Sequence, residues 1–120
     1  MEDSMTQSDC VFCKIANEEI PSKKLYEDDE IIAFDDINPE TPVHFLVVPK
    51  RHIETLDDIK DDDAPLVAKM ILIGTKLARE KGIAKDGYRQ VINCREGGGQ
   101  VVFHLHMHIL GGRQIGQRLA

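Results

Sequence analysis

The stretch His104-Leu105-His106-Met107-His108-Ile109-Leu110 has a histidine at every second position, with apolar residues between them. In an extended strand, alternate side chains lie on the same face. We therefore predict a strand over residues 103–110 in which the three histidines form a row on one face. The opposite face is expected to enter the core with Phe103, Leu105, Met107 and Ile109.

A row of three histidines has three interpretations. It can be the polar face of a half-exposed strand, although Lys, Thr or Glu would serve there equally well. It can be a metal site, because imidazole is a common neutral ligand of metal ions. It can also be a catalytic centre in which one imidazole attacks while its neighbours fix its tautomer and neutralise a phosphate.

A glycine-rich loop, Gly97-Gly98-Gly99-Gln100, leads directly into the row of histidines. Glycines let consecutive backbone amides turn towards an anion, so a phosphate would fit beside the imidazoles. This placement favours the catalytic interpretation.

Composition limits the size and the class of the protein. We expect one domain over residues 1–120, with residues 1–9 as a flexible tail. No apolar run approaches the roughly 20 residues of a membrane-spanning helix. The acidic start does not resemble an export signal, and three cysteines then indicate reduced thiols in the cytoplasm. The net charge of −6 argues against a nucleic-acid partner, although backbone amides can still hold a small anion.

Periodicity outside the row predicts the remaining elements. Residues 10–19 have helical spacing, and residues 64–81 form the longest expected helix, with Asp61 to Asp63 at its start and Gly82 at its end. Its broad apolar face is expected to pack on a sheet and on a second copy of the chain. Further strands are predicted at Lys24–Glu27, Ile31–Asp35, 44–48 and 88–93. Successive strands with few helices favour an antiparallel α+β fold.

The row of histidines, followed by Gly111-Gly112-Arg113, resembles the histidine-triad (HIT) superfamily, specifically its Hint branch of nucleotide-binding phosphoramidases. Further blocks occur in the family's order: Phe12-Cys13-Lys14-Ile15, Ile20-Pro21, Tyr26-Glu27-Asp28, Ala33-Phe34-Asp35-Asp36-Ile37, Pro42-Val43-His44 and Val48-Pro49-Lys50-Arg51-His52-Ile53. The resemblance covers nearly the whole chain. It implies a HIT-like α+β fold whose five-stranded antiparallel sheet, with one long and one short helix, continues across a homodimer.

The resemblance implies a role for each histidine. His106 would attack the α-phosphorus of a purine nucleotide, such as an AMP or GMP derivative, and expel the leaving group; water would then hydrolyse the nucleotidyl-histidine. His108 would hydrogen-bond the phosphate, and His44 would belong to the same proton-shuttling network. His104 would orient its neighbours. The transferase branch typically has Gln at the third position of the row, so His108 favours hydrolysis, for which no cofactor is required.

The resemblance also implies a nucleotide-binding set. Asp36 would accept the ribose hydroxyls, and Asn93 would lie near the phosphate. The base pocket would consist of Phe12, Ile15, Ile37 and Leu46, and the phosphate loop would contain Gly99, Gln100, Val101 and Val102. Two positions depart from the family pattern: Val101 stands where Ser is common, and Arg95 stands where Gly is common.

These nucleotide-binding positions also have simpler interpretations. The apolar side chains can be ordinary core residues, Asp36 can cap a turn, and Asn93 can end a strand. His44 can be a histidine that merely satisfies its own hydrogen bonds.

The spacing of Cys10 and Cys13 lets two thiolates reach one ion, but a tetrahedral site needs two more ligands. His52 has no partner in the nucleophilic chemistry, and His104 is the member of the row that this chemistry needs least. We therefore expect a structural zinc ion on Cys10, Cys13, His52 and His104, the set that some similar bacterial HIT proteins carry. The alternative is two buried thiols in a helix. Redox use is disfavoured, because the motif lacks a thioredoxin-like context.

Three competing functions remain from the sequence. The chain can be a dinucleoside polyphosphate hydrolase, a nucleotide-binding regulatory module with vestigial activity, or a metal-binding protein. The ending Gly111-Gly112-Arg113 favours the Hint branch over the first of these.

Overall fold

The structure, a computed structural model, describes residues 9–117, so only Asp9 of the predicted N-terminal tail lies within the described residues. The elements in chain order are α1 (Val11–Ala16), β1 (Lys24–Glu27), β2 (Ile31–Asp35), β3 (Val43–Pro49), α2 (Ala64–Glu80), β4 (Arg89–Val91) and β5 (Met107–Gly111). Short 3-10 turns occur at Leu56–Asp58, Asp61–Asp63 and Glu96–Gly98.

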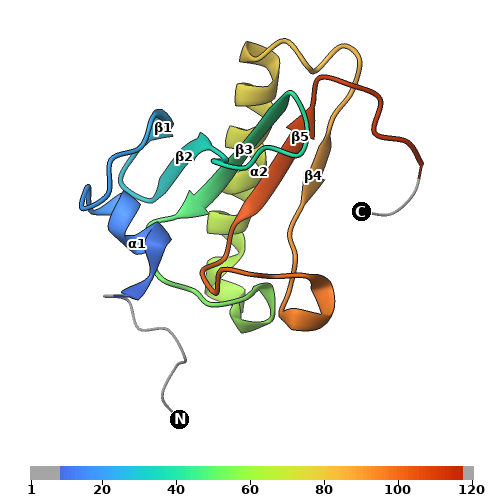
Figure 1. The fold of residues 1–120 in the computed structure, drawn as a ribbon. Coiled ribbons are helices and arrows are strands. Elements are labelled where there is room, and N and C mark those ends of the chain that lie inside the picture. Colours follow the sequence, from blue (N-terminus) through green and yellow to red (C-terminus); the bar gives the residue numbers. More distant parts are fainter. Residues whose placement is uncertain (1–8, 118–120) are drawn as a thin grey trace.

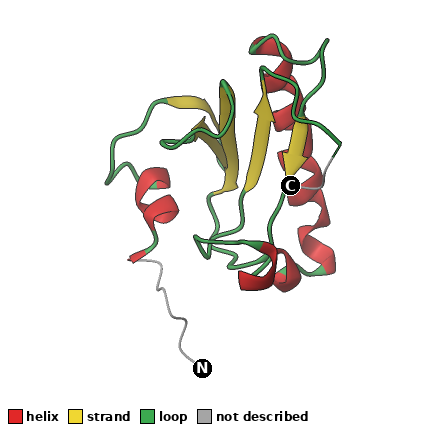
Figure 2. Cartoon of the chain, turned by 45° about the vertical axis from the view of Figure 1, so that its right-hand side comes forward, coloured by secondary structure: helices red, strands yellow, loops and turns green. Residues whose placement is uncertain are grey.

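The strands form one antiparallel sheet in the order β1-β2-β3-β5-β4 (Figures 1 and 2). The predicted α+β fold, with a five-stranded antiparallel sheet and one long and one short helix, is confirmed. β3 is central, because it pairs with β2 on one side and with β5 on the other. No helix within residues 9–117 is long and apolar enough to cross a bilayer.

Helix α2 covers one face of the sheet and lies behind it in Figure 1. The main core lies between them, and its buried residues include Ile31, Ala33, Phe45, Val47, Met70, Ile73, Leu77, Leu105, Met107 and Ile109. Gly74 allows the close approach of the helix, since a Cβ there would lie 2.9 Å from Met107 Cε and 3.2 Å from Ile109 Cδ1. The face of β5 predicted to enter the core therefore does so at Leu105, Met107 and Ile109.

The opposite face of the sheet carries α1 and the histidines. A second apolar cluster there contains Cys10, Phe12, Cys13, Ile15, Ile32, Phe34, Leu46 and Val48. Helix α1 starts after Cys10, whose Sγ atom accepts a hydrogen bond from the backbone amide of Cys13 (3.4 Å). Because both faces are covered, β3 is buried from His44 to Pro49.

The strand predicted over residues 103–110 is shorter in the structure, where β5 begins at Met107. The ladder ends at the pair Val47 and Met107. Two residues further, the register would place Leu105 opposite Pro49, which has no amide hydrogen to donate. The chain leaves β3 at this point, and the Leu105 amide instead donates to the Ile53 carbonyl (2.6 Å).

Two details of the sequence-based prediction are wrong. Phe103 is only half-buried and belongs to neither core cluster, since it precedes the paired part of the strand. Asp63 stands directly before α2 as expected, but its carboxylate does not cap that helix. It accepts a hydrogen bond from the Lys60 amide and forms an ion pair with Arg51.

Candidate active site

His106 is the middle histidine of the row, and only 7% of its surface is exposed. Its Nδ1 atom is 2.7 Å from the His104 carbonyl oxygen. A carbonyl oxygen only accepts, so Nδ1 carries the hydrogen and the lone pair of the neutral ring is at Nε2. Within residues 9–117 this Nε2 atom has no hydrogen-bond partner and is not enclosed, since His52 Nε2 is the only side-chain nitrogen or oxygen there that is both enclosed and unpartnered. His106 therefore presents a free nucleophilic nitrogen.

His44 and His108 form a second unit beside His106. The Glu40 amide donates to His44 Nδ1 (3.0 Å), so neutral His44 carries its hydrogen at Nε2. That Nε2–H group lies 3.0 Å from His108 Nδ1 and 3.4 Å from Asp36 Oδ2. Neutral His108 accepts at Nδ1 and consequently keeps a hydrogen at Nε2. The pair can thus pass a proton along β3 and β5 to a group bound beside the row.

Burial keeps the row of histidines uncharged at neutral pH. It lowers the pKa of His104 to about 4 and also lowers the pKa of His106. Burial, together with the neighbouring His106 and His44, lowers the pKa of His108 to about 4. A neutral imidazole is the form that attacks, so the environment favours the reactive state of His106.

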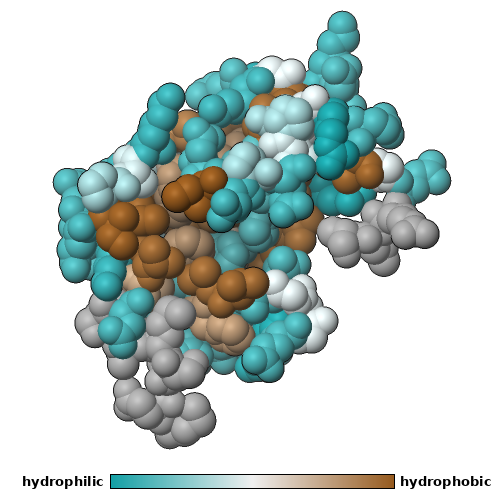
Figure 3. Space-filling view, viewed as in Figure 1, coloured by the Kyte–Doolittle hydropathy of each residue, from teal (hydrophilic) through white to brown (hydrophobic). Residues whose placement is uncertain are grey.

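The proposed base-pocket residues divide into two groups. Phe12, Ile15 and Leu46 are buried in the second cluster, where the Phe12 ring meets the His106 ring edge-on with centroids 5.0 Å apart. Ile37 instead is 90% exposed in the loop after β2. Figure 3 views this face of the sheet and shows apolar side chains gathered on it. The structure therefore places an apolar wall directly beside His106.

Asp36 follows β2 and lies next to the histidines. Its Oδ1 atom accepts a hydrogen bond from the Asn38 amide (2.8 Å), which makes it a turn-capping residue, as its simpler interpretation required. Its Oδ2 atom faces His44. Both carboxylate oxygens therefore have a neighbour, and Oδ2, 3.4 Å from His44 Nε2, can accept a further hydrogen bond beside the row.

The loop before the row is fixed by internal hydrogen bonds. The Gly99 amide donates to the Glu96 carbonyl and the Gln100 amide to the Arg95 carbonyl, both at 3.0 Å. Within the described part of the chain, the amides of Val101 and Val102 have no hydrogen-bond partner. The loop folds back onto half-buried Asn93. Of the predicted phosphate loop, the amides of Val101 and Val102 are therefore the ones that remain free to donate.

Cys10, Cys13, His52 and His104 come together although they are distant in the sequence, and one ligand atom from each lies within 4.8 Å of the others. His104 Nδ1 is 3.2 Å from Cys10 Sγ and 3.4 Å from Cys13 Sγ. His52 Nδ1 is 3.2 Å from Cys13 Sγ. A tetrahedral zinc ion with bonds of about 2.3 Å to sulfur and about 2.0 Å to nitrogen separates such atoms by about 3.5 Å.

The hydrogen bonds of His104 also fit a metal ligand. Its Nε2–H group donates to the Pro49 carbonyl (2.7 Å), which leaves the lone pair at Nδ1, facing the thiols. A backbone carbonyl commonly orients metal-binding histidines in this way. The predicted set therefore fits a structural zinc ion. In the absence of a metal ion, burial and the neighbouring Cys10 raise the pKa of the Cys13 thiol to about 12.

A second group of candidate ligands, Asp36, His44 and His108, does not fit a metal ion. The lone pair of His44 at Nδ1 is already used by the Glu40 amide. Its Nε2 atom then carries a hydrogen where a metal ion needs a lone pair. This group is therefore suited to proton transfer rather than to metal binding.

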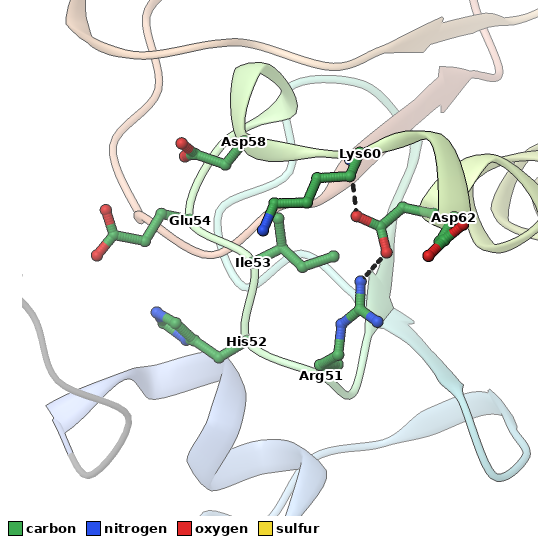
Figure 4. Close-up of a pocket in the computed structure, with 8 residues that line it drawn as sticks. Arg51, His52, Ile53, Glu54, Asp58, Lys60 and Asp62 are labelled. Atoms are coloured by element: carbon green, nitrogen blue, oxygen red, sulfur yellow. Dashed lines mark hydrogen bonds and ion pairs between the residues drawn. The ribbon is translucent and has the colours of Figure 1, made fainter.

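A cavity of about 580 Å³ lies away from the row and reaches only His52 of the histidines (Figure 4). It is lined by Arg51, His52, Ile53, Glu54, Asp58, Lys60, Asp62 and Asp63. Its four carboxylates, on Glu54, Asp58, Asp62 and Asp63, outnumber its two cationic side chains, Arg51 and Lys60, so the cavity is unfavourable for an anionic nucleotide. It has no aromatic wall for a base, so the row of histidines remains the candidate active site.

Comparisons with known proteins identify the family of the chain. The family profile described as "Scavenger mRNA decapping enzyme C-term binding" matches residues 9–119. The chain is 44% identical over 110 residues to the purine nucleoside phosphoramidase of Escherichia coli, with 92% of each protein covered. It matches a solved HIT family hydrolase of Clostridium thermocellum with a TM-score of 0.92 at 44% identity, over 96% of this chain and 100% of that one. A HIT family hydrolase of Legionella pneumophila matches with a TM-score of 0.87 at 50% identity, over 89% and 96%.

The similarity to HIT family hydrolases, in a chain with a row of three histidines, identifies an enzyme of the histidine-triad class. The chain belongs to the histidine-triad (HIT) family. The resemblance inferred from the sequence is thereby confirmed.

Proposed function

We propose that this chain cleaves the bond between the α-phosphate of a purine nucleoside monophosphate and its leaving group, through a nucleotidyl-histidine at His106. The observation that carries the proposal is the orientation of His106, whose Nδ1–H group is held by the His104 carbonyl while Nε2 is free. The similar protein of Escherichia coli, a purine nucleoside phosphoramidase, supports the substrate class.

The proposed reaction has two steps. His106 Nε2 attacks the α-phosphorus, and the bond from phosphorus to the leaving nitrogen breaks. The leaving nitrogen keeps the bonding electron pair and takes a proton from His108 Nε2, which a proton from solvent replaces so that His108 stays neutral. Water then attacks the phosphorus, gives a proton through His108 back to solvent, and releases the nucleoside monophosphate and free His106. His44 stabilises His108 in the proton-accepting state through their 3.0 Å contact.

We assign substrate binding to groups that take no part in the two chemical steps. The free amides of Val101 and Val102 would donate to phosphate oxygens, and Asn93 would lie beside them. Asp36 Oδ2 would accept from a ribose hydroxyl. The base would lie against Phe12, Ile15, Ile37 and Leu46.

We expect purified protein to hydrolyse adenosine phosphoramidate, but not diadenosine polyphosphate or ADP, when the three are assayed side by side. The expectation follows from the likeness to a phosphoramidase and from a row that ends in His108. Preferred cleavage of the diadenosine compound would make the chain a dinucleoside polyphosphate hydrolase. Binding of AMP without turnover of any of the three would make it a regulatory module.

We also propose a homodimer in which the sheet continues across the interface. β4 is an edge strand, and α2 leaves Ile71 44% and Leu72 61% exposed. A second copy would bury this apolar face and pair the open edge. Light scattering at micromolar concentration is expected to give twice the mass of one chain, and a monomer mass would contradict the dimer.

Zinc on Cys10, Cys13, His52 and His104 is proposed as a structural component. It would fix α1 to the segment that carries the row and hold the His104 ring, with no part in the chemistry at phosphorus. The reduced thiols that such a site requires are consistent with a cytoplasmic location.

A further inference from the structure

Arg95 adopts a backbone conformation that side chains other than glycine rarely take. Its φ is 60° and its ψ is −177°, and among the described residues only Glu18 is also a non-glycine residue with positive φ. Such conformations persist only where the surrounding structure holds them, and they concentrate at functional sites. Arg95 opens the turn Glu96–Gly98, which precedes the free amides of Val101 and Val102.

Hydrogen bonds within the loop hold the backbone of Arg95 from both sides. Its amide donates to Gln100 Oε1 (2.7 Å). Its carbonyl accepts from the amides of Gly98 (3.1 Å) and Gln100 (3.0 Å). The backbone of Arg95, the strained residue, thus makes the hydrogen bonds that close the loop.

Two side chains connect this loop to residues 54–58. Buried Gln100 donates through Nε2 to the Glu54 carbonyl (2.8 Å). Arg95 places Nη1 3.0 Å from Asp57 Oδ2 and Nη2 3.6 Å from Asp58 Oδ1. Asp58 is itself held by the hydroxyl of buried Thr55 (2.7 Å). Asp58, one partner of the guanidinium, is therefore held in place by the protein and is not a freely moving surface side chain.

We propose that Arg95 is a positioning residue, whose ion pair with Asp57 and Asp58 keeps the strained turn closed so that the Val101 and Val102 amides point towards the phosphate. This inference rests on the proposed function for the identity of the ligand, but the closed turn itself does not. Because all three side chains are substantially exposed, salt should weaken the contact. Arg95 thus makes substrate affinity sensitive to ionic strength.

Hydrogen exchange tests the closed turn without any substrate. Arg95→Ala removes the guanidinium but still places a non-glycine residue in the strained backbone conformation. Asp57→Asn combined with Asp58→Asn removes the two negative charges that pair with the guanidinium. Both variants are expected to exchange the amides of Gly98 and Gln100 about threefold faster than the wild-type protein, as measured by NMR. Lys24→Ala, which removes an exposed ion pair on β1, is the matched control and should leave these amides unchanged. Unchanged exchange in Arg95→Ala would overturn the proposal.

Kinetics test the consequence for the substrate. With adenosine phosphoramidate, Arg95→Ala should raise KM about threefold with little change in kcat, and Arg95→Lys should restore most of the affinity. Between about 0.05 and 0.5 M salt, the wild-type KM should rise towards that of Arg95→Ala, whose own KM should change less. Equal KM values and equal salt dependence in both proteins would contradict the positioning role. Absence of turnover in the wild-type protein would instead contradict the proposed function. The hydrogen-exchange result would still show whether the Arg95 ion pair keeps the turn closed.

Discussion

His106→Ala is expected to lower kcat for adenosine phosphoramidate by at least about a thousandfold, because the covalent step has no other nucleophile in place. Binding of AMP should stay within about threefold of the wild-type value, since the proposed phosphate, ribose and base contacts do not involve this imidazole. Steady-state kinetics and calorimetric titration with AMP measure the two effects separately.

A matched control distinguishes loss of the nucleophile from damage to the core. Met107→Leu changes the adjacent, fully buried position with little change in volume, and should retain both activity and binding. If His106→Ala kept activity within about tenfold of the wild-type protein, His106 would not be the nucleophile. If it lost AMP binding as well, the assignment of binding to separate groups would be wrong.

The alternation of histidine and apolar residues correctly predicts the core face from Leu105 onwards, although not at Phe103. Leu105, Met107 and Ile109 are in the core, and the histidines lie opposite. It could not predict where pairing starts, because that depends on the partner strand. Pro49 ends the ladder with β5 on the β3 side, and its carbonyl accepts from the His104 ring instead.

The tautomers of the histidines could not be predicted from the sequence. They depend on the His104 and Pro49 carbonyls and on the Glu40 amide, which are backbone groups that every residue type can supply. Their positions follow only from the paths of β3 and of residues 103–106. The same applies to Arg95, which the sequence marked only as an unusual residue where glycine is common.

The metal-ligand set shows what spacing alone can predict. Cys10 and Cys13 are three residues apart, so their proximity in a short helix was expected. The approach of His52 and His104 depends on the ends of β3 and of the segment before β5. Both imidazoles nevertheless turn Nδ1 towards the thiols, as the predicted zinc site requires.

Protein purified without chelator is expected to contain about one zinc per chain, and a variant with both Cys10→Ser and Cys13→Ser should contain none. A metal ion bound only to the native state stabilises it by mass action, so the variant should melt roughly 10 °C lower or more. Cys94→Ser is the matched control, because this third cysteine is half-buried and outside the set. Elemental analysis and thermal denaturation measure both effects.

Loss of the zinc ion should also lower the activity of the candidate active site. The His104 ring would lose its ligand at Nδ1 and keep only the hydrogen bond of Nε2 to the Pro49 carbonyl, and the His104 carbonyl is the group that holds His106 Nδ1–H. We therefore expect kcat to fall in the double serine variant even where the protein remains folded, with a smaller effect on AMP binding. Metal-free wild-type protein with unchanged activity and melting temperature would instead make Cys10 and Cys13 ordinary core thiols, held by the same apolar cluster as Phe12 and Ile15.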